Sequence, residues 1–135
     1  MASGSIKRIL KLVAINDLVE TEEHCAETSK KLAERMIAIG FWTVPIAVES
    51  SMMAIMDGHH RLNASKYIGL IRVPCTIMSY KDGGVSLMSW RNDVVCTVPD
   101  IRIMVERGEK YPLKTTRHVF NPSIDAVEIP LGLLY

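Results

Sequence analysis

The sequence predicts a single α/β (α+β) domain with a small mixed sheet and about three helices. Its 135 residues suit one domain with a modest core. The composition, 48% hydrophobic and 23% charged, is typical of a soluble globular protein. Short apolar runs alternate with segments of helical periodicity, and glycines and turn residues separate them. We expect residues 1–8 to be a flexible leader and residues 9–135 to form the domain.

Local patterns assign each element in turn. Alternating or continuous apolar runs predict strands at residues 9–15, 44–49, 52–56, 73–79 and 85–90. Apolar residues at helical spacing predict helices at residues 23–39, 62–68 and 101–107, each followed by a glycine suited to the helix C-terminus. Residues 111–120 read as loop or strand, and the apolar tail 129–135 is expected to dock on the body of the domain.

Composition excludes several classes of protein. The net charge is +1, and no run of Lys and Arg exceeds two residues, so nucleic-acid binding is not expected. The apolar run at residues 9–15 is too short to span a bilayer, and the N-terminus lacks the layout of a signal peptide. Three widely spaced cysteines favour reduced, packed thiols over a disulfide framework or a zinc site. These observations predict a cytoplasmic protein without a membrane segment.

The segment 57–64, Asp-Gly-His-His-Arg-Leu-Asn-Ala, is the most informative motif. It joins a predicted buried strand to a predicted helix, and a helix start offers free N–H groups that favour an anion. Gly58 lets the backbone approach a phosphate closely, and the side chains of His59, His60 and Arg61 can donate to phosphate oxygens. Asp57 is either a helix N-cap or a ligand of Mg²⁺ near the phosphates. The motif therefore predicts phosphate binding.

A second polar segment lies near the carboxyl end. Residues 114–118, Lys-Thr-Thr-Arg-His, carry two cations, two hydroxyl groups and an imidazole. A segment with this composition usually forms a solvent-exposed loop. The alternative is recognition of a substrate carboxylate and phosphate, in which alternate side chains of an extended segment would face the ligand.

These motifs, with a strand from Gly83 to Trp90 and an acidic turn before the first helix, resemble the ParB/sulfiredoxin superfamily. Within it the sequence is most similar to the free L-serine kinases, the archaeal ADP-dependent enzyme and its siderophore-pathway relative. The similarity covers roughly residues 9–125. Sulfiredoxins place a catalytic cysteine where this chain has His59, so their sulfur chemistry is not expected. ParB proteins carry a Gly-Glu-Arg-Arg box and a second, DNA-binding domain, and this chain has neither.

The resemblance implies a magnesium-dependent kinase that transfers a phosphoryl group from ATP or ADP to free L-serine, giving O-phospho-L-serine. It implies that Glu22 orients the hydroxyl group and takes its proton, and that Asp57 acts on Mg²⁺ or on the hydroxyl group. The nucleotide would be bound by Gly58, His59, His60 and Arg61. The amino acid would be bound by Trp90, Lys114, Thr115, Thr116, Arg117 and His118.

Several alternatives stay open at this point. Glu20, Glu22 and Glu23 all lie in the acidic turn, where a carboxylate can simply complement a helix dipole. Trp90 could be a core residue. The known kinases carry an extra segment after the Trp90 strand that is nearly absent here, which favours a non-catalytic nucleotide-binding or regulatory module; a DNA-associated protein is a third possibility. The apolar tail, Leu131 to Tyr135, could form a contact in a homo-oligomer.

Overall fold

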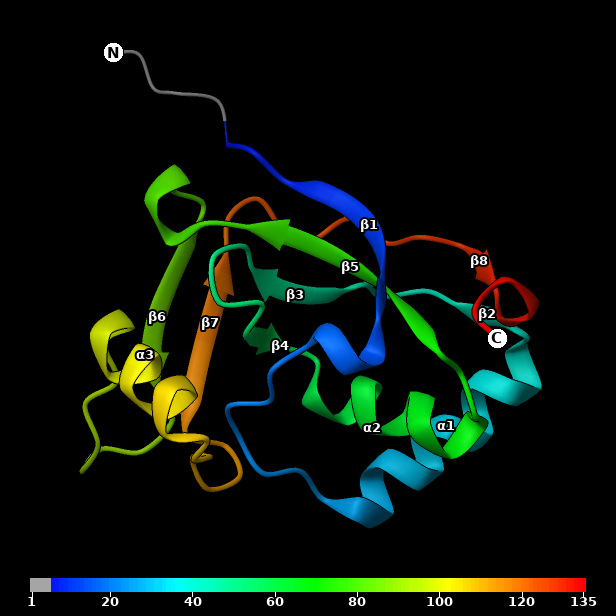
Figure 1. The fold of residues 1–135 in the computed structure, drawn as a ribbon, viewed down its shortest axis with the longest axis horizontal. Helices are drawn as coiled ribbons and strands as arrows, with labels where there is room; N and C mark the ends of the chain where they lie inside the picture. Colours follow the sequence, from blue (N-terminus) through cyan, green and yellow to red (C-terminus); the bar gives the residue numbers. More distant parts are fainter. Residues whose placement is uncertain (1–5) are drawn as a thin grey trace.

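The computed structural model describes residues 6–135 and is built around a four-stranded mixed sheet (Figure 1). The strand order is β1-β5-β3-β4, with β1 at Ile9–Ala14, β5 at Arg72–Met78, β3 at Ile46–Glu49 and β4 at Ile55–Asp57. Strand β5 pairs antiparallel with β1 and parallel with β3, and β3 pairs antiparallel with β4. This arrangement confirms the predicted fold class.

Two helices that pack against each other cover the lower side of this sheet in the view of Figure 1. They are α1 at Ala26–Ile39 and α2 at His59–Ile68. The core between sheet and helices contains fully buried Trp42, Ile46, Leu62 and Val73. Helix α1 ends at Ile39 and is followed by Gly40, whose left-handed φ of 84° confirms the predicted glycine C-cap.

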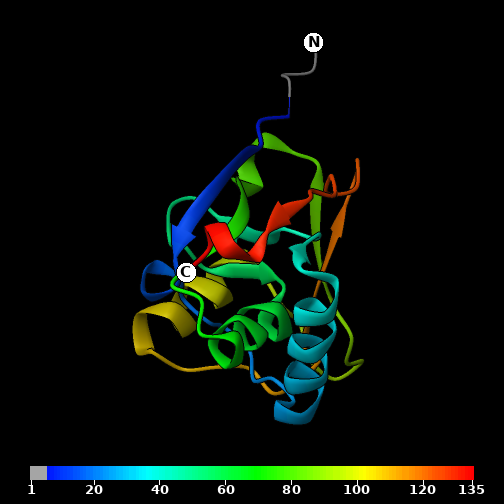
Figure 2. The same ribbon diagram turned by 90° about the vertical axis from the view of Figure 1, so that its right-hand side faces the viewer.

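Two small antiparallel pairs complete the fold. Strand β2 (Phe41–Trp42) pairs with β8 (Ile129–Pro130), and β6 (Val85–Ser89) pairs with β7 (Thr116–Phe120). Helix α3 (Val98–Arg107) lies in front of the β6–β7 pair in the view of Figure 1. Figure 2 shows the C-terminal segment running back across the molecule toward β2. Leu131 and Leu134 are buried, so the predicted docking of the tail is confirmed.

Some predicted boundaries were wrong. The apolar run 52–56 forms a strand only from Ile55, because Met53 has a φ of 54° in the turn after β3. Helix α2 begins at His59 rather than Leu62, so the histidines lie within its first turn. Helix α3 begins at Val98 rather than Ile101, because Thr97 forms a capping box with Asp100.

The remaining boundary differences are small. Helix α1 begins at Ala26 rather than residue 23, and β3 begins at Ile46 rather than residue 44. The expected flexible leader falls partly outside the described residues, which start at Ile6. Residues 6–8 lead into β1, where the Arg8 guanidinium donates to the carbonyls of Gly84 and Ser123. Among the helices of residues 6–135, none has both the length and the apolar character that crossing a membrane requires.

Candidate active site

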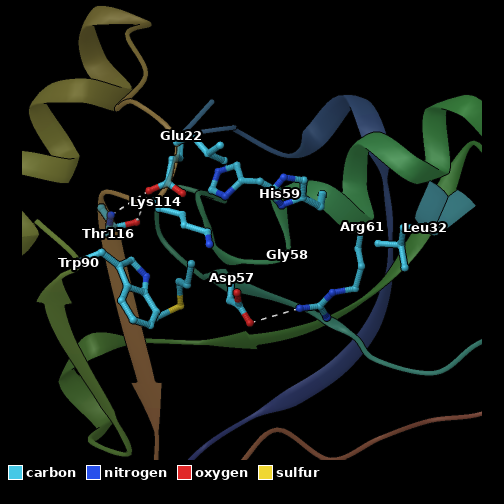
Figure 3. A pocket seen from close by; sticks show the side chains of 12 residues that line it. Glu22, Leu32, Asp57, Gly58, His59, Arg61, Trp90, Lys114 and Thr116 are labelled. Atoms are coloured by element: carbon cyan, nitrogen blue, oxygen red, sulfur yellow. Dashed lines mark hydrogen bonds and ion pairs between the residues drawn. The ribbon is translucent and has the colours of Figure 1, made fainter. Parts of the chain in front are cut away.

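A cavity of about 260 Å³ brings the two predicted motifs and the acidic turn together (Figure 3). The turn lies before α1, the 57–61 motif connects β4 to α2, and the 114–118 segment enters β7. The predicted site residues that line this cavity are Glu22, Asp57, Gly58, His59, His60, Arg61, Trp90, Lys114 and Thr116. Segments distant in the sequence therefore share one cavity.

Gly58 shapes the floor of the cavity. Its φ of 114° lies in the region that favours glycine, and a Cβ there would lie 3.2 Å from Ile46 Cγ1 and 3.4 Å from Arg61 Cζ. Gly58 is also the N-cap of α2, and no side chain caps that helix. The first N–H groups of α2 therefore lack intrahelical acceptors, and the residues that carry them line the cavity, where a helix start of this kind favours an anion.

Asp57 and Arg61 form an ion pair at the edge of this helix start. Arg61 Nη2 lies 3.2 Å from Asp57 Oδ2, and Arg61 Nη1 donates to the carbonyls of Val44 (2.9 Å) and Pro45 (2.6 Å). Burial lowers the pKa of Arg61 from its usual value. Asp57 does not cap α2, so the N-cap alternative for this residue is wrong. Its side chain is 61% exposed, which leaves it accessible to a ligand.

Both histidines of the motif accept hydrogen bonds from the acidic turn. His59 Nε2 accepts from the N–H of Thr21 (3.0 Å), and His60 Nε2 accepts from the N–H of Cys25 (3.0 Å). Burial lowers the pKa of His59 to about 4, so its ring is neutral at physiological pH. The Nε2 atoms are thus engaged within the protein, and a contact with phosphate would have to use the opposite side of each ring.

Glu22 connects the acidic turn to the carboxyl-terminal motif. Its Oε1 accepts three hydrogen bonds, from the N–H of Thr115 (3.0 Å), the N–H of Thr116 (2.8 Å) and the hydroxyl group of Thr116 (3.1 Å). Within residues 6–135, no hydrogen bond engages its Oε2. The first oxygen fixes the carboxylate in place, and the second is available on the cavity side.

The structure separates Glu22 from its two neighbouring carboxylates. Glu20 lies 2.7 Å from Asn63 Nδ2 and forms ion pairs with Lys66 and Lys110, and its pKa is lowered despite a large desolvation penalty. Glu23 does not line the cavity. Glu22 lies three residues before the N-cap of α1, Cys25, so a simple helix-dipole role does not account for its position.

The residues of the 114–118 segment point in different directions. Lys114 has a φ of 55°, and Figure 3 shows its side chain extending into the cavity between Glu22 and Asp57. Thr115 is buried, donates to the carbonyl of Pro112 and lines neither cavity at this site. Its predicted contact with substrate is not supported by this placement, because its hydroxyl group is used within the loop.

A second cavity of about 440 Å³ adjoins the first and shares Asp57 and Trp90 with it. Arg117 and His118 line this second cavity. Trp90 is 57% exposed, with the Arg117 guanidinium 4.4 Å from its ring centroid, so the alternative of a core tryptophan is wrong. The two cavities therefore meet at Asp57 and Trp90.

The residues fit Mg²⁺ only in combination with phosphate. Among the described residues there is no group of three or more His, Cys, Asp or Glu side chains that could hold a metal ion. Mg²⁺ is commonly bound through one or two carboxylates together with substrate phosphates. Asp57, exposed at the start of α2, is the residue suited to that role.

Apolar walls of the site were missed by the sequence analysis. Leu32 of α1, Met56 of β4 and Leu113 line the first cavity. Val119, Phe120 and Ile124 line the second. Leu32 belonged to the apolar face of a predicted helix, which is a signal for burial and not for a ligand site. These side chains lie beside the polar motifs only in the folded chain, because contacts between segments distant in the sequence bring them together.

No family model matches the sequence. An ATP-dependent L-serine kinase of Desulfurococcus mucosus is 28% identical over 102 residues, which are 72% of this chain and 40% of that protein. A ParB-like protein of Sulfolobus acidocaldarius is 36% identical over 58 residues, 43% of this chain and 29% of the relative. The chain thus spans less than half the length of these curated relatives.

A solved structure extends the similarity to the whole fold. A glutamate variant of a free serine kinase in complex with ADP superposes with a TM-score of 0.84 at 14% identity, covering 96% of each chain. The fold is that of the free serine kinases. The resemblance inferred from the sequence, to the ParB/sulfiredoxin superfamily near these kinases, is confirmed.

Proposed function

We propose that residues 9–135 form a kinase domain that transfers a phosphoryl group from ATP or ADP to the hydroxyl group of free L-serine. The products are O-phospho-L-serine and a nucleotide one phosphate shorter. The observation that carries the proposal is that a fixed carboxylate, Glu22, and the uncapped start of α2 face one cavity. The names of the relatives, serine kinases acting with ATP or bound to ADP, support the same activity.

The start of α2 is the proposed phosphate site. Its free N–H groups and the helix dipole favour an anion, and Gly58 leaves room for the phosphate beside the backbone. Arg61 contributes charge from the edge of this site and also holds Asp57. Lys114, whose side chain lies between Glu22 and Asp57 in Figure 3, adds a cation that would neutralise charge on the transferring group.

Glu22 is the proposed acceptor of the hydroxyl proton. The serine oxygen attacks the terminal phosphorus of the nucleotide, a new O–P bond forms, and the bond from that phosphorus to the leaving phosphate oxygen breaks. The proton of the hydroxyl group passes to Glu22 Oε2, while Oε1 stays bound to Thr115 and Thr116. A carboxylate held by three donors loses little freedom when it orients the substrate, which favours in-line geometry.

The second cavity is the proposed site of the amino acid. Arg117 and His118 line it, and Trp90 and Asp57 connect it to the phosphate site. Serine bound there would direct its hydroxyl group past the shared residues toward the first cavity, which Glu22 lines. Mg²⁺, held by Asp57 and the nucleotide phosphates, would supply charge neutralisation at the phosphoryl group.

The proposal is tested by exchanging one carboxylate at a time. Glu22→Gln keeps the shape of the side chain and removes the base, so phosphoserine formation should fall about a hundredfold or more. Glu23→Gln is the matched control, because Glu23 lies next to it and does not line the cavity. Equal rates for the two variants, measured by phosphoserine formation at saturating substrates, would rule out the assigned role of Glu22.

A non-catalytic nucleotide-binding module is the second candidate. It is favoured by the match to a relative named as a ParB-like protein, which is 36% identical over 58 residues. An assay of phosphoserine formation, with calorimetry to establish that nucleotide binds, separates the two: the module would bind ADP or ATP and produce no phosphoserine at any concentration of L-serine.

A further inference from the structure

Helix α2 carries both the proposed phosphate site and two imidazole rings that contact the acidic turn. His59 and His60 are the first two residues of the helix. His59 Nε2 accepts from the N–H of Thr21 (3.0 Å), and His60 Nε2 accepts from the N–H of Cys25 (3.0 Å). The two donors precede and follow Glu22 in the sequence. The turn that carries the proposed base is therefore bonded to α2 on both sides of that residue.

The direction of these hydrogen bonds fixes the role of each ring nitrogen. A backbone N–H can only donate, so each Nε2 is unprotonated and a neutral ring carries its proton on Nδ1. His59 lines the first cavity but is only 7% exposed, which leaves little of its surface for a ligand. The bond to the turn is thus the contact that accounts for the orientation of the His59 ring.

The acidic turn is bonded on its other side to the carboxyl-terminal part of the chain. The N–H of Tyr111 donates to the carbonyl of Thr21 (2.8 Å), and the N–H of Glu23 donates to the carbonyl of Tyr111 (2.8 Å). The Glu22 carboxylate adds its three hydrogen bonds to the 114–118 segment (Figure 3). The turn and this part of the chain therefore form one unit, and the two imidazoles bond that unit to α2.

We propose that His59 and His60 are positioning residues that hold Glu22 at a fixed place relative to the start of α2, through the two N–H groups of the turn that donate to their rings. The inference rests on the proposed function, in which Glu22 takes the serine proton and the start of α2 binds the phosphate. In-line transfer requires a fixed separation between these groups, and a displacement of about 1 Å can lower a rate about a hundredfold.

Exchange of His59 for glutamine and for asparagine separates positioning from phosphate binding. Glutamine places its amide oxygen near the position of Nε2 and can accept the same N–H, whereas asparagine reaches only the position of Nδ1. We expect His59→Asn to lower the kcat of phosphoserine formation about ten- to a hundredfold and to leave the KM for nucleotide within about twofold. His59→Gln should restore most of that kcat.

Two results of this comparison would overturn the inference. One is the opposite order, in which His59→Asn stays active and His59→Gln loses affinity for nucleotide, because that order would identify Nδ1 as a phosphate contact. The other is an equal kcat in the two variants, because an acceptor at the position of Nε2 would then have no effect on the reaction.

The turn keeps contacts with β4 in these variants. Thr21 Oγ1 donates to the carbonyl of Ile55 (3.2 Å), and the N–H of Ile55 donates to the carbonyl of Val19 (3.0 Å). Loss of one imidazole should therefore leave the fold intact, which urea unfolding checks. If His59→Asn does not fold, the same two exchanges at half-buried His60 make the test, with the same expected order and the same contradicting results.

Hydrogen exchange of the Thr21 amide gives a readout that does not depend on catalysis. The amide should exchange slowly in the unmodified chain and in His59→Gln, and about tenfold or more faster in His59→Asn. Equal exchange in the three proteins would overturn the inference. Failure of the proposed function is distinguishable, because it would appear as absent phosphoserine in the unmodified chain while the amide exchange remained measurable.

Discussion

Replacing Gly58 with alanine should be far more damaging than replacing another left-handed glycine. Gly58 has a φ of 114°, and its added Cβ would lie 3.2 Å and 3.3 Å from two carbons of Ile46. Gly69, at the end of α2, has a φ of 90° and no atom within 4 Å of its added Cβ. The pair separates backbone strain from steric overlap.

The expected losses in the free energy of unfolding follow from backbone strain and steric overlap. A left-handed conformation costs an L-residue about 1–2 kcal/mol, which is the whole effect expected for Gly69→Ala. Overlap in a packed region adds about 1–3 kcal/mol at Gly58. Gly58→Ala should therefore lower the free energy of unfolding by about 2–5 kcal/mol, a large part of the stability of a typical domain.

Urea-induced unfolding at 25 °C measures both variants, and calorimetry with nucleotide measures their function. Gly58→Ala should weaken nucleotide binding, because relief of the overlap displaces Ile46 or the Arg61 guanidinium, whereas Gly69→Ala should leave binding unchanged. Equal losses of stability would refute the close packing of Gly58 against Ile46, and equal nucleotide affinity in the two variants would refute the proposed role of Gly58 in nucleotide binding.

Two further predictions concern fluorescence and pH. Trp90 is exposed in the site and Trp42 is fully buried in the core, so the change in tryptophan emission on adding nucleotide and L-serine should disappear in Trp90→Phe; a persistent change would place the ligands elsewhere. His59 and His118 each have a pKa lowered to about 4, so the unfolded chain binds more protons than the folded one between about pH 6.5 and 4. Stability should be fully present above pH 6.5 and fall as the pH drops through this window, by up to about 3 kcal/mol for each histidine. Urea unfolding at several pH values checks this, and a flat profile would contradict neutral burial of the two rings.

The sequence predicted the elements because their signals are local. The glycine after α1 and the apolar face of that helix are readable from a few neighbouring residues. Boundaries failed where a backbone conformation outweighed the apolar pattern, as at Met53. The start of α2 was placed too late because the two histidines show no apolar helical pattern. Their rings accept hydrogen bonds from residues 21 and 25, and these distant contacts hold the first helical turn.

Most residues of the site could be predicted from the sequence, but which of the two cavities each residue lines could not. The 57–61 motif and the 114–118 segment were found from their residue types. Their convergence depends on Glu22, which binds the backbone of residues 115 and 116, a contact across more than ninety positions. The hydroxyl group of Thr115 donates within its own loop, to the carbonyl of Pro112, and the residue types of the segment did not distinguish this arrangement from a contact with substrate.

The most direct measurement of the central claim is ³¹P NMR of the protein with Mg²⁺, ATP or ADP, and a panel of free amino acids. We predict a new phosphomonoester signal that appears with L-serine, grows with time and is lost in Glu22→Gln. Nucleotide signals that stay unchanged with every amino acid, or a phosphomonoester that forms equally in Glu22→Gln, would contradict the account.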